Sequence, residues 1–169
     1  DVVSGRGEFK GFTVRLNHDC TEAILRFVFR STEPITRLKK ALPEINSAFP
    51  QIRVVSVNIQ PIHAAIPEGP EEHILPGSSV ITEKYCGMPF VAGPQTFSQV
   101  THQTADELYR RVAQAIAESG TSSLLDLFCG IGVFSLTAAS HLQHGFGVEI
   151  SPHSIRCAES SAALNNIKH

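Results

Sequence analysis

The hydrophobic pattern changes part way along the chain, and this change predicts two kinds of structure. In the first part, short apolar runs predict two strands, over residues 8–16 and 23–30, that pair across a turn at Asn17-His18-Asp19. Further short strands bounded by Pro and Gly turns are expected in the same part, over residues 52–59, 62–66, 79–84 and 89–92. Residues 1–95 are therefore interpreted as a β-rich α+β domain.

One helix is expected within this β-rich part. After Pro34, apolar residues recur at helical spacing: Ile35, Leu38, Leu42 and Ile45. Pro43 lies inside this pattern. Because proline removes a backbone donor and clashes with the preceding turn, we expect a kink or an early end of the helix there.

Beyond Pro94 the pattern alternates between helices and strands. Thr104-Ala105-Asp106-Glu107 has the form of a capping box and predicts a helix that stops at Gly120. A buried parallel strand is expected over residues 123–128, followed by a helix from Val133.

The last elements repeat this order. A second strand should close at Glu149, and a helix over residues 152–165 should follow, with Ser151 as N-cap and Pro152 in its first turn. We assign residues 96–169 to the first part of a Rossmann-like α/β domain. Because a complete doubly wound domain needs several more strands, we expect the chain to be an internal piece of a longer protein.

Composition argues against a broad nucleic-acid-binding surface. The chain has 14 Lys and Arg against 16 Asp and Glu, a formal net charge of −2, so no overall positive field would attract a polyanion. Basic clusters at residues 37–40 and 110–111 are typical of solvated helix faces. No apolar run reaches the roughly 18 residues of a membrane span, and the start lacks a signal peptide's apolar stretch, so we expect no membrane contact and a cytoplasmic location.

The four cysteines do not predict a metal site. Cys20, Cys86, Cys129 and Cys157 form no C-x-x-C pair, and the eight histidines form no spaced ligand set. Cys129 lies in a glycine-rich turn, but a small residue at a strand end is more often packing than chemistry. We therefore assign no catalytic residue and no metal ligand in this chain.

The glycine-rich turn is the main candidate for ligand binding. Asp126-Leu127-Phe128-Cys129-Gly130-Ile131-Gly132 follows a predicted strand and precedes a helix, as in a cofactor-binding loop. Glu149 lies 23 positions after Asp126 (149 − 126 = 23), near the roughly 20 expected for a carboxylate that holds ribose hydroxyls.

Two observations favour S-adenosylmethionine over a dinucleotide. Asp126 would repel a pyrophosphate but attract the ammonium and sulfonium groups of the methyl donor. The third glycine of the dinucleotide fingerprint is missing, because Ser135 occupies its place. A glycine turn without any nucleotide, with Glu149 as an ordinary solvated strand end, stays open as the simpler alternative.

Three separated motifs carry a more specific resemblance. The segments Phe97-Ser98-Gln99, Asp126 to Gly132 and Gly147-Val148-Glu149-Ile150 resemble those of the S-adenosylmethionine-dependent RNA (uracil-5-)-methyltransferases. Residues 25–31, 57–61 and 157–162 are similar to the bacterial members that make 5-methyluridine in 23S ribosomal RNA. The likeness covers nearly the whole chain and implies a Rossmann-like methyltransferase domain over residues 96–169.

The resemblance implies a role for each matching position. Gln99 is similar to the amide that hydrogen-bonds the cofactor, and Phe97 to the aromatic residue that shapes the pocket. Gly130, Gly132 and Phe128 would line the cofactor loop, with Asp126 near the methionine end and Glu149 on the ribose. One departure is Thr101, where the family often has Asn two positions after the glutamine.

The resemblance also implies what the longer protein does. It would transfer a methyl group to C5 of a uridine in 23S rRNA, with its nucleophilic cysteine and its glutamate base downstream of this chain and any 4Fe–4S cluster ligands upstream. This piece alone is expected to be inactive and, through an uncovered sheet, to self-associate. Three alternatives stay open: a tRNA uracil-5-methyltransferase, a non-catalytic RNA-docking scaffold and a piece of an NAD-dependent oxidoreductase.

Overall fold

The computed structural model describes residues 6–63, 66–99 and 101–168, and these form two compact units. The division falls between Ile81 and Thr82. The first unit therefore ends before most of the hairpin that was expected to belong to the β-rich part. The domain boundary between residues 95 and 96 stays a prediction.

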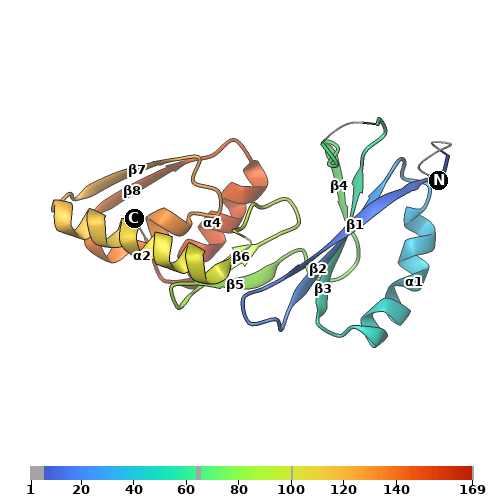
Figure 1. Ribbon diagram of the computed structural model, residues 1–169, viewed down its shortest axis with the longest axis horizontal. Helices are drawn as coiled ribbons and strands as arrows, with labels where there is room; N and C mark the ends of the chain where they lie inside the picture. Colours follow the sequence, from blue (N-terminus) through green and yellow to red (C-terminus); the bar gives the residue numbers. More distant parts are fainter. Residues whose placement is uncertain (1–5, 64–65, 100, 169) are drawn as a thin grey trace. The chain divides into compact units, whose positions relative to one another are not determined.

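The first unit is a four-stranded sheet in the order β1-β2-β3-β4 (Figure 1). Its strands span Phe9–Leu16 (β1), Ala23–Phe29 (β2), Ile52–Ile59 (β3) and Glu71–Ile74 (β4). β1 and β2 pair antiparallel across the predicted turn, β2 and β3 pair in parallel, and β4 returns antiparallel to β3. Helix α1, Ile35–Ala48, makes the crossover that the parallel pair requires.

Helix α1 continues past Pro43, so of the two outcomes expected there, a kink or an early end, the early end is wrong. Its apolar stripe packs on one face of the sheet, where Leu42 is buried among residues of β2 and β3. Burial of this stripe is worth more than the hydrogen bond that proline removes, because tertiary packing supplies most of the stability of a helix in a protein.

The predicted strand over residues 62–66 is wrong for the described positions 62, 63 and 66, while 64 and 65 lie outside the described residues. The backbone there is held as a loop, because the Gln60 amide donates hydrogen bonds to the carbonyls of Ile66 and Glu68, both at 3.0 Å. The fourth strand forms later, at Glu71–Ile74.

A buried polar cluster explains why β4 pairs where it does. Arg26 on β2 is 6% exposed and donates two hydrogen bonds to the Glu72 carboxylate, from Nε at 3.0 Å and from Nη2 at 2.7 Å. The fully buried Asn58 on β3 donates to the same carboxylate at 2.9 Å. Because a buried charge is costly without a partner, this arrangement fixes Glu72 opposite Asn58.

The second unit begins within a hairpin of β5, Ile81–Tyr85, and β6, Met88–Ala92. The two residues of its turn, Cys86 and Gly87, have φ of 51° and 84°, as a tight type I′ turn needs. Asp106 accepts a hydrogen bond from the Cys86 N–H at 3.0 Å. This contact anchors the turn to helix α2, which spans His102–Ser119.

The predicted capping box of α2 is wrong. The helix begins three residues earlier, with Thr101 as N-cap and no side-chain capping hydrogen bond, so Thr104 lies inside it. Glu107 pairs instead with Arg110 and Arg111 of the following turn. The predicted stop at Gly120 is confirmed, since Gly120 ends the helix with φ of 65°.

The rest of the second unit follows the predicted order. Strand β7 spans Ser123–Leu127 and pairs in parallel with β8, His144–Val148. Between them lie the short helix α3, Val133–Thr137, and the 3₁₀ turn η1, Ala139–His141. Helix α4, Pro152–Leu164, begins at the predicted N-cap, where Ser151 Oγ accepts the Ser154 N–H at 3.2 Å.

A chain of aromatic rings forms part of the core of this unit. Tyr85 on β5 packs edge-on against Phe90 on β6 and Tyr109 on α2, with ring centroids 5.6 and 5.4 Å apart. Tyr109 in turn packs against Phe134 on α3 at 4.9 Å. The hairpin, α2 and the start of α3 are thereby held together.

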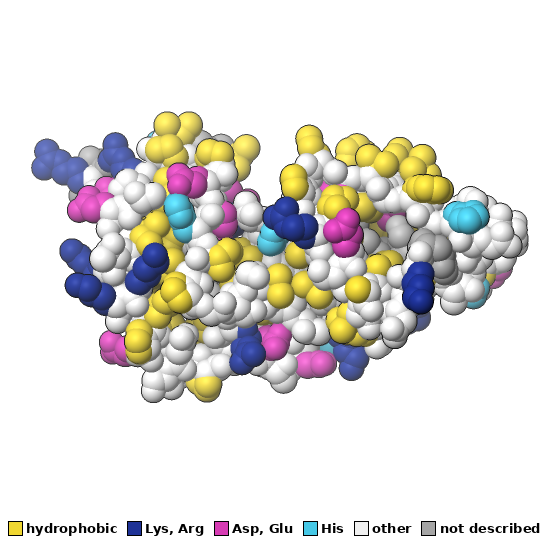
Figure 2. All heavy atoms as spheres, turned by 180° about the vertical axis from the view of Figure 1, so that it is seen from behind, with side chains coloured by type: hydrophobic (Ala, Val, Ile, Leu, Met, Phe, Trp, Pro, Cys, Tyr) yellow, Lys and Arg dark blue, Asp and Glu magenta, His cyan; other side chains and the backbone are white. Residues whose placement is uncertain are grey.

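One face of the β7–β8 sheet is apolar and uncovered. Its side chains are more than half exposed: Leu125 61%, Leu127 59%, Phe146 64% and Val148 53%. Figure 2 shows hydrophobic side chains gathered over the part of this unit where Figure 1 places β7 and β8. The apolar sheet surface that the sequence led us to expect is therefore exposed.

Among the described residues, no helix combines the length and apolar character needed to cross a bilayer.

Candidate functional site

The loop after β7 has an unusual backbone. Phe128, Gly130 and Gly132 all lie in the left-handed region, with φ of 65°, 57° and 81°. Glycine adopts this region at little cost, but a bulky residue such as Phe128 does not. The side chain of Phe128 is also 86% exposed, so the strained residue presents its ring to solvent.

The loop is fastened to the end of β8. The N–H groups of Phe128 and Cys129 both donate to the carbonyl of Val148, at 2.7 and 3.1 Å. Gly132 N–H donates to the Cys129 carbonyl at 2.8 Å and closes the loop on itself. The carboxyl ends of the two parallel strands therefore meet at this loop, which is where open α/β sheets bind ligands.

Glu149 joins the two strand ends through its carboxylate. One oxygen accepts the Gly130 N–H at 3.0 Å, and the other accepts the Ser151 N–H at 2.9 Å. The Ser151 hydrogen bond, aided by the one from Gly130, lowers the pKa of Glu149 against a smaller opposing effect of burial. The carboxylate is therefore ionised at neutral pH, with lone pairs left to accept hydroxyl groups of a ligand.

Asp126 points toward α3 instead of standing free. Its carboxylate accepts a hydrogen bond from the Ser135 hydroxyl at 2.6 Å. Ser135 occupies the position of the missing third glycine, and the sequence pattern gives no sign of this contact. In the structure, Ser135 orients the half-buried Asp126 at the foot of the glycine loop.

Cys129 packs tightly beneath β8. A Cβ atom built on Gly147 would lie 2.7 Å from Cys129 Sγ, so only glycine fits opposite this thiol. Burial raises the pKa of Cys129, and the charges of Asp126 and Glu149 raise it further. A buried, protonated thiol is a poor nucleophile, which agrees with a packing role.

Phe97 and Gln99 lie on a separate segment that follows β6. Phe97 is 75% exposed and Gln99 is half-buried. In the described part of the chain, no hydrogen bond or ring contact joins either side chain to the glycine loop. The structure thus joins Gly130 to Glu149, places Asp126 on Ser135 at the foot of the same loop, and leaves the Phe97–Gln99 segment outside these contacts.

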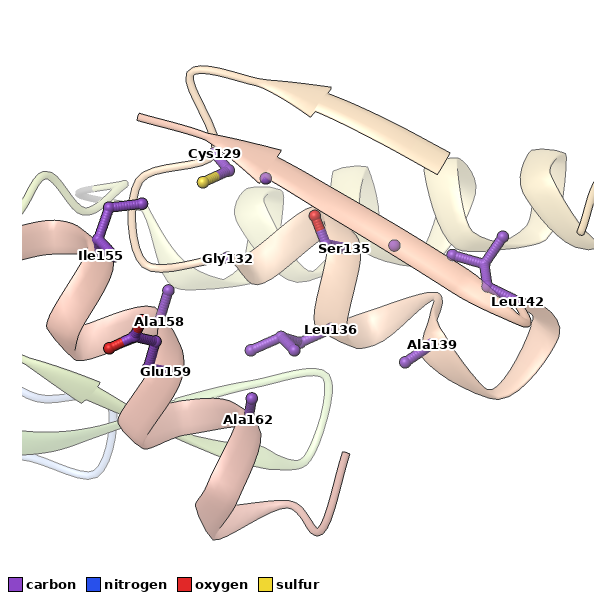
Figure 3. A pocket seen from close by; sticks show the side chains of 12 residues that line it. Cys129, Gly132, Ser135, Leu136, Ala139, Leu142, Ile155, Ala158, Glu159 and Ala162 are labelled. Atoms are coloured by element: carbon purple, nitrogen blue, oxygen red, sulfur yellow. The ribbon is translucent and has the colours of Figure 1, made fainter. Parts of the chain in front are cut away.

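A pocket of about 270 Å³ lies between α3, α4 and β8. Figure 3 shows Ala158 and Ala162 of α4 pointing toward Leu136 of α3 across it. Of the predicted cofactor residues, only Gly132 lines this pocket. The missing side chains of Gly145 and Gly147 on β8 open it, so we interpret it as a packing gap and not as the ligand site.

The described residues offer no alternative metal centre. They contain no group of three His, Cys, Asp or Glu side chains placed to hold an ion, and the four cysteines are not bonded to one another. The site chemistry consequently rests on backbone N–H groups, two carboxylates and an exposed aromatic ring.

This arrangement fits an adenosine-bearing, positively charged ligand. A Cβ on Gly130 would meet nothing within 4 Å, so the loop is open on the side where a ligand would approach. The Glu149 carboxylate suits ribose hydroxyls, and the Asp126 carboxylate suits a cationic group. A pyrophosphate would face two negative charges at this edge.

Comparison with known proteins identifies relatives over nearly the whole length of the chain. A family model described as tRNA (Uracil-5-)-methyltransferase matches residues 87–169. The 23S rRNA (uracil(747)-C(5))-methyltransferase RlmC of Shewanella pealeana is 41% identical over 162 residues, which is 96% of this chain and 43% of that protein. The RlmC of Shewanella sp. strain W3-18-1 is 40% identical over 167 residues, 99% of this chain and 43% of that protein.

Solved structures show the same fold. The Pyrococcus abyssi tRNA (uracil-54, C5)-methyltransferase, in complex with S-adenosyl-L-homocysteine, matches with a TM-score of 0.74 at 17% identity, over 99% of this chain and 39% of that one. Methanocaldococcus jannaschii Trm5, in complex with adenosine, matches with a TM-score of 0.53 at 15% identity, over 97% of this chain and 45% of that one.

These comparisons confirm the predicted fold class, a β-rich part followed by part of a Rossmann-like methyltransferase domain. The chain spans about 43% of the length of the curated relatives that it matches.

Proposed function

The chain belongs to the family of RNA (uracil-5-)-methyltransferases, and we propose that the whole protein transfers a methyl group from S-adenosylmethionine to C5 of a uridine in RNA. The observation that carries this proposal is the carboxylate of Glu149, which holds the open glycine loop and the start of α4 in one network. Its remaining lone pairs can accept hydrogen bonds, which supports a role in holding the ribose hydroxyls of the methyl donor.

We assign the donor site to seven residues of this chain: Phe97, Gln99, Asp126, Phe128, Gly130, Gly132 and Glu149. When bound, S-adenosylmethionine supplies the methyl group and its electrophilic character. Glu149 would hold the ribose, Asp126 would stabilise the cationic end, and Phe128 would offer an aromatic face. The buried, protonated state of Cys129 supports the proposal that no catalytic residue lies in this chain.

We propose 23S ribosomal RNA as the substrate and the cytoplasm as the location. The substrate rests on the names of relatives that share about 40% identity across nearly the whole chain. Transfer RNA is the competing substrate, because the matching family model carries that description. Both RNAs have the uridine C5 that this chemistry requires.

Methylation assays on the full-length protein test this function. The protein should transfer a labelled methyl group to 23S rRNA and leave tRNA unlabelled, and 5-methyluridine should appear in the digested RNA. Labelling of tRNA alone would move the substrate to tRNA. Absence of labelling in both, with S-adenosylhomocysteine still bound, would favour a docking role over an enzyme.

Glu149→Ala in the full-length protein tests the site. We expect donor affinity to fall by about 1–3 kcal/mol, the range for buried hydrogen-bonding groups that lose their partners, with RNA affinity unchanged. Unchanged donor affinity would show that Glu149 only links the glycine loop to the start of α4.

We also propose that residues 1–169, expressed alone, self-associate through the uncovered face of β7 and β8. The support is the row of exposed apolar side chains on that face, since contiguous apolar surface of this kind tends to associate.

A further inference from the structure

Helix α4 holds the strand that leads into the Phe97–Gln99 segment. The N–H of Val91 on β6 donates to Ser161 Oγ at 2.9 Å, and the side-chain amide of Asn165 donates to the carbonyl of Pro89 at 2.7 Å. Both contacts run from a side chain of α4 to the backbone of β6. They fix β6 against the helix without depending on the side chains that β6 carries.

Ser161 is fully buried, and its hydroxyl uses both its donor and an acceptor. It donates to the carbonyl of Cys157 at 2.7 Å while accepting the Val91 N–H. Asn165, the C-cap of α4, also donates to the carbonyl of Ser161 at 2.8 Å. Removal of Ser161 would leave the Val91 N–H without its partner, and removal of Asn165 would leave the Pro89 carbonyl without its partner. Such unpaired backbone groups are costly, so either change should loosen β6 from the helix.

The connection from β6 to Phe97 is short and closed on itself. Thr96, 7% exposed, donates its N–H to the Gly93 carbonyl at 3.1 Å, and its hydroxyl accepts the Gly93 N–H at 3.2 Å. Phe97 follows immediately. A displacement of β6 would therefore be passed on to Phe97 and Gln99 instead of being absorbed by a loose linker.

The opposite end of α4 lies at the glycine loop. Ser151 caps the helix with its side chain and donates its N–H to Glu149, which in turn holds Gly130. One rigid helix consequently contacts the Glu149 network at its start and the strand leading to Gln99 at its end. It links two parts of the site that share no hydrogen bond or ring contact among the described residues.

We propose that Ser161 and Asn165 are positioning residues for donor binding, which set the place of the Phe97–Gln99 segment relative to Glu149. The inference rests on the proposed function and extends it to two residues that lie outside the motifs of the cofactor loop. Neither side chain touches the donor. Each acts through the backbone of β6.

Two matched pairs of variants in the full-length protein test this. Ser161→Ala removes the hydroxyl that holds Val91, whereas Ser160→Ala removes a hydroxyl that makes the same kind of bond within the helix, to the Arg156 carbonyl at 2.8 Å, but does not hold β6. Asn165→Asp keeps the shape and loses the donor to Pro89. Asn166→Asp adds the same charge one position further on, at a residue exposed to solvent.

We expect Ser161→Ala and Asn165→Asp to raise KM for S-adenosylmethionine by about tenfold, with kcat at saturating donor and KM for RNA within about twofold of wild type. Both control variants should keep the wild-type KM. A merely structural role would lower the amount of folded enzyme and leave KM unchanged. If Ser161→Ala does not fold, Asn165→Asp carries the test.

Equal donor KM in both test variants and both controls would overturn the positioning role while the proposed function stands. Failure of the wild-type protein to bind S-adenosylhomocysteine in calorimetry would instead overturn the proposed function, and the inference with it.

Discussion

Phe128 has two features that do not favour the stability of the fold, a left-handed backbone and an exposed aromatic ring. Its left-handed backbone costs on the order of 1 kcal/mol for a bulky side chain, and its 86% exposed ring recovers little of that by packing. Strain of this kind concentrates at sites where binding requires it. Phe128 is therefore better explained by ligand binding than by the stability of the fold.

Phe128→Gly should therefore have opposite effects on stability and binding. We expect the free energy of unfolding to rise by about 1 kcal/mol, because glycine relieves the left-handed strain. Affinity of the full-length protein for S-adenosylhomocysteine should fall. Thermal unfolding and calorimetry measure the two effects, and Phe128→Ala separates them, since it removes the ring but keeps the strain. Undiminished affinity in both variants would place the ring outside the donor site.

The lowered pKa of Glu149 predicts how its network responds to acid. A carboxyl group with a depressed pKa in the folded state contributes stability above its ordinary pKa of about 4.3, and this contribution is lost as the pH falls through the folded-state value. The Gly130 amide proton, observed by NMR in this chain, should shift with an inflection below that ordinary value. Glu149→Gln should abolish the inflection. An inflection at or above pH 4.3 in the unmodified chain would contradict the role of the two N–H groups.

At the scale of elements, strand β8 contains two glycines that differ in the space available for a side chain. Gly147 faces Cys129 so closely that a Cβ atom would lie 2.7 Å from the sulfur, whereas a Cβ on Gly145 would meet nothing within 4 Å. Both line the same pocket. Of these two glycines, packing requires only Gly147.

Alanine at these two positions should shift stability in opposite directions. Gly145→Ala should raise the free energy of unfolding by about 0.5–1 kcal/mol, because it restricts the unfolded chain and adds a methyl group beside an open pocket. Gly147→Ala should lower it by about 1–3 kcal/mol through overpacking against Cys129. Urea titration of the two variants measures both changes, and a loss of stability in Gly145→Ala would show that the pocket tolerates no added methyl group.

Sequence patterns predicted those elements whose own residues determine them. Helix α4 followed from the Ser151 cap and Pro152, and β1 and β2 from their apolar runs around a turn. The strand expected at 62–66 failed because Gln60 binds the loop carbonyls from outside the segment, and β4 depends on Arg26 from another strand. The capping box failed because the helix begins before Thr104 and Glu107 pairs with Arg110 and Arg111. Each miss involves a partner outside the predicted segment.

At the scale of the whole molecule, the candidate site was only partly visible in the sequence. The spacing between Asp126 and Glu149 gave the two carboxylates at one sheet edge, and the structure supplies the hydrogen bonds that connect Glu149 to the loop. The Ser135 contact and the α4 contacts to β6 could not be predicted, because they depend on how helices pack on strands. Nothing in the residues around Ser161 in the sequence indicates that its hydroxyl binds the backbone of β6.

The uncovered face of β7 and β8 predicts the behaviour of the chain in solution. Residues 1–169 should sediment as dimers or larger species at high concentration, because the exposed row on this face would be buried between copies. Leu125→Lys together with Phe146→Lys should return the chain to a monomer, while Arg37→Lys on α1 should leave association unchanged. Analytical ultracentrifugation that finds a monomer for the unmodified chain at high concentration would contradict self-association.

The fastening of the glycine loop to Val148 also has a consequence for synthesis on the ribosome. The N–H groups of Phe128 and Cys129 have their partner on a strand that is translated later, and Gly130 likewise waits for Glu149. These three N–H groups therefore cannot be paired as the loop emerges, and the loop gains its full set of hydrogen bonds only when β8 has left the exit tunnel and paired with β7. A pause in translation before β8 would prolong the period in which this loop is open to proteases, whereas a pause after α4 would not.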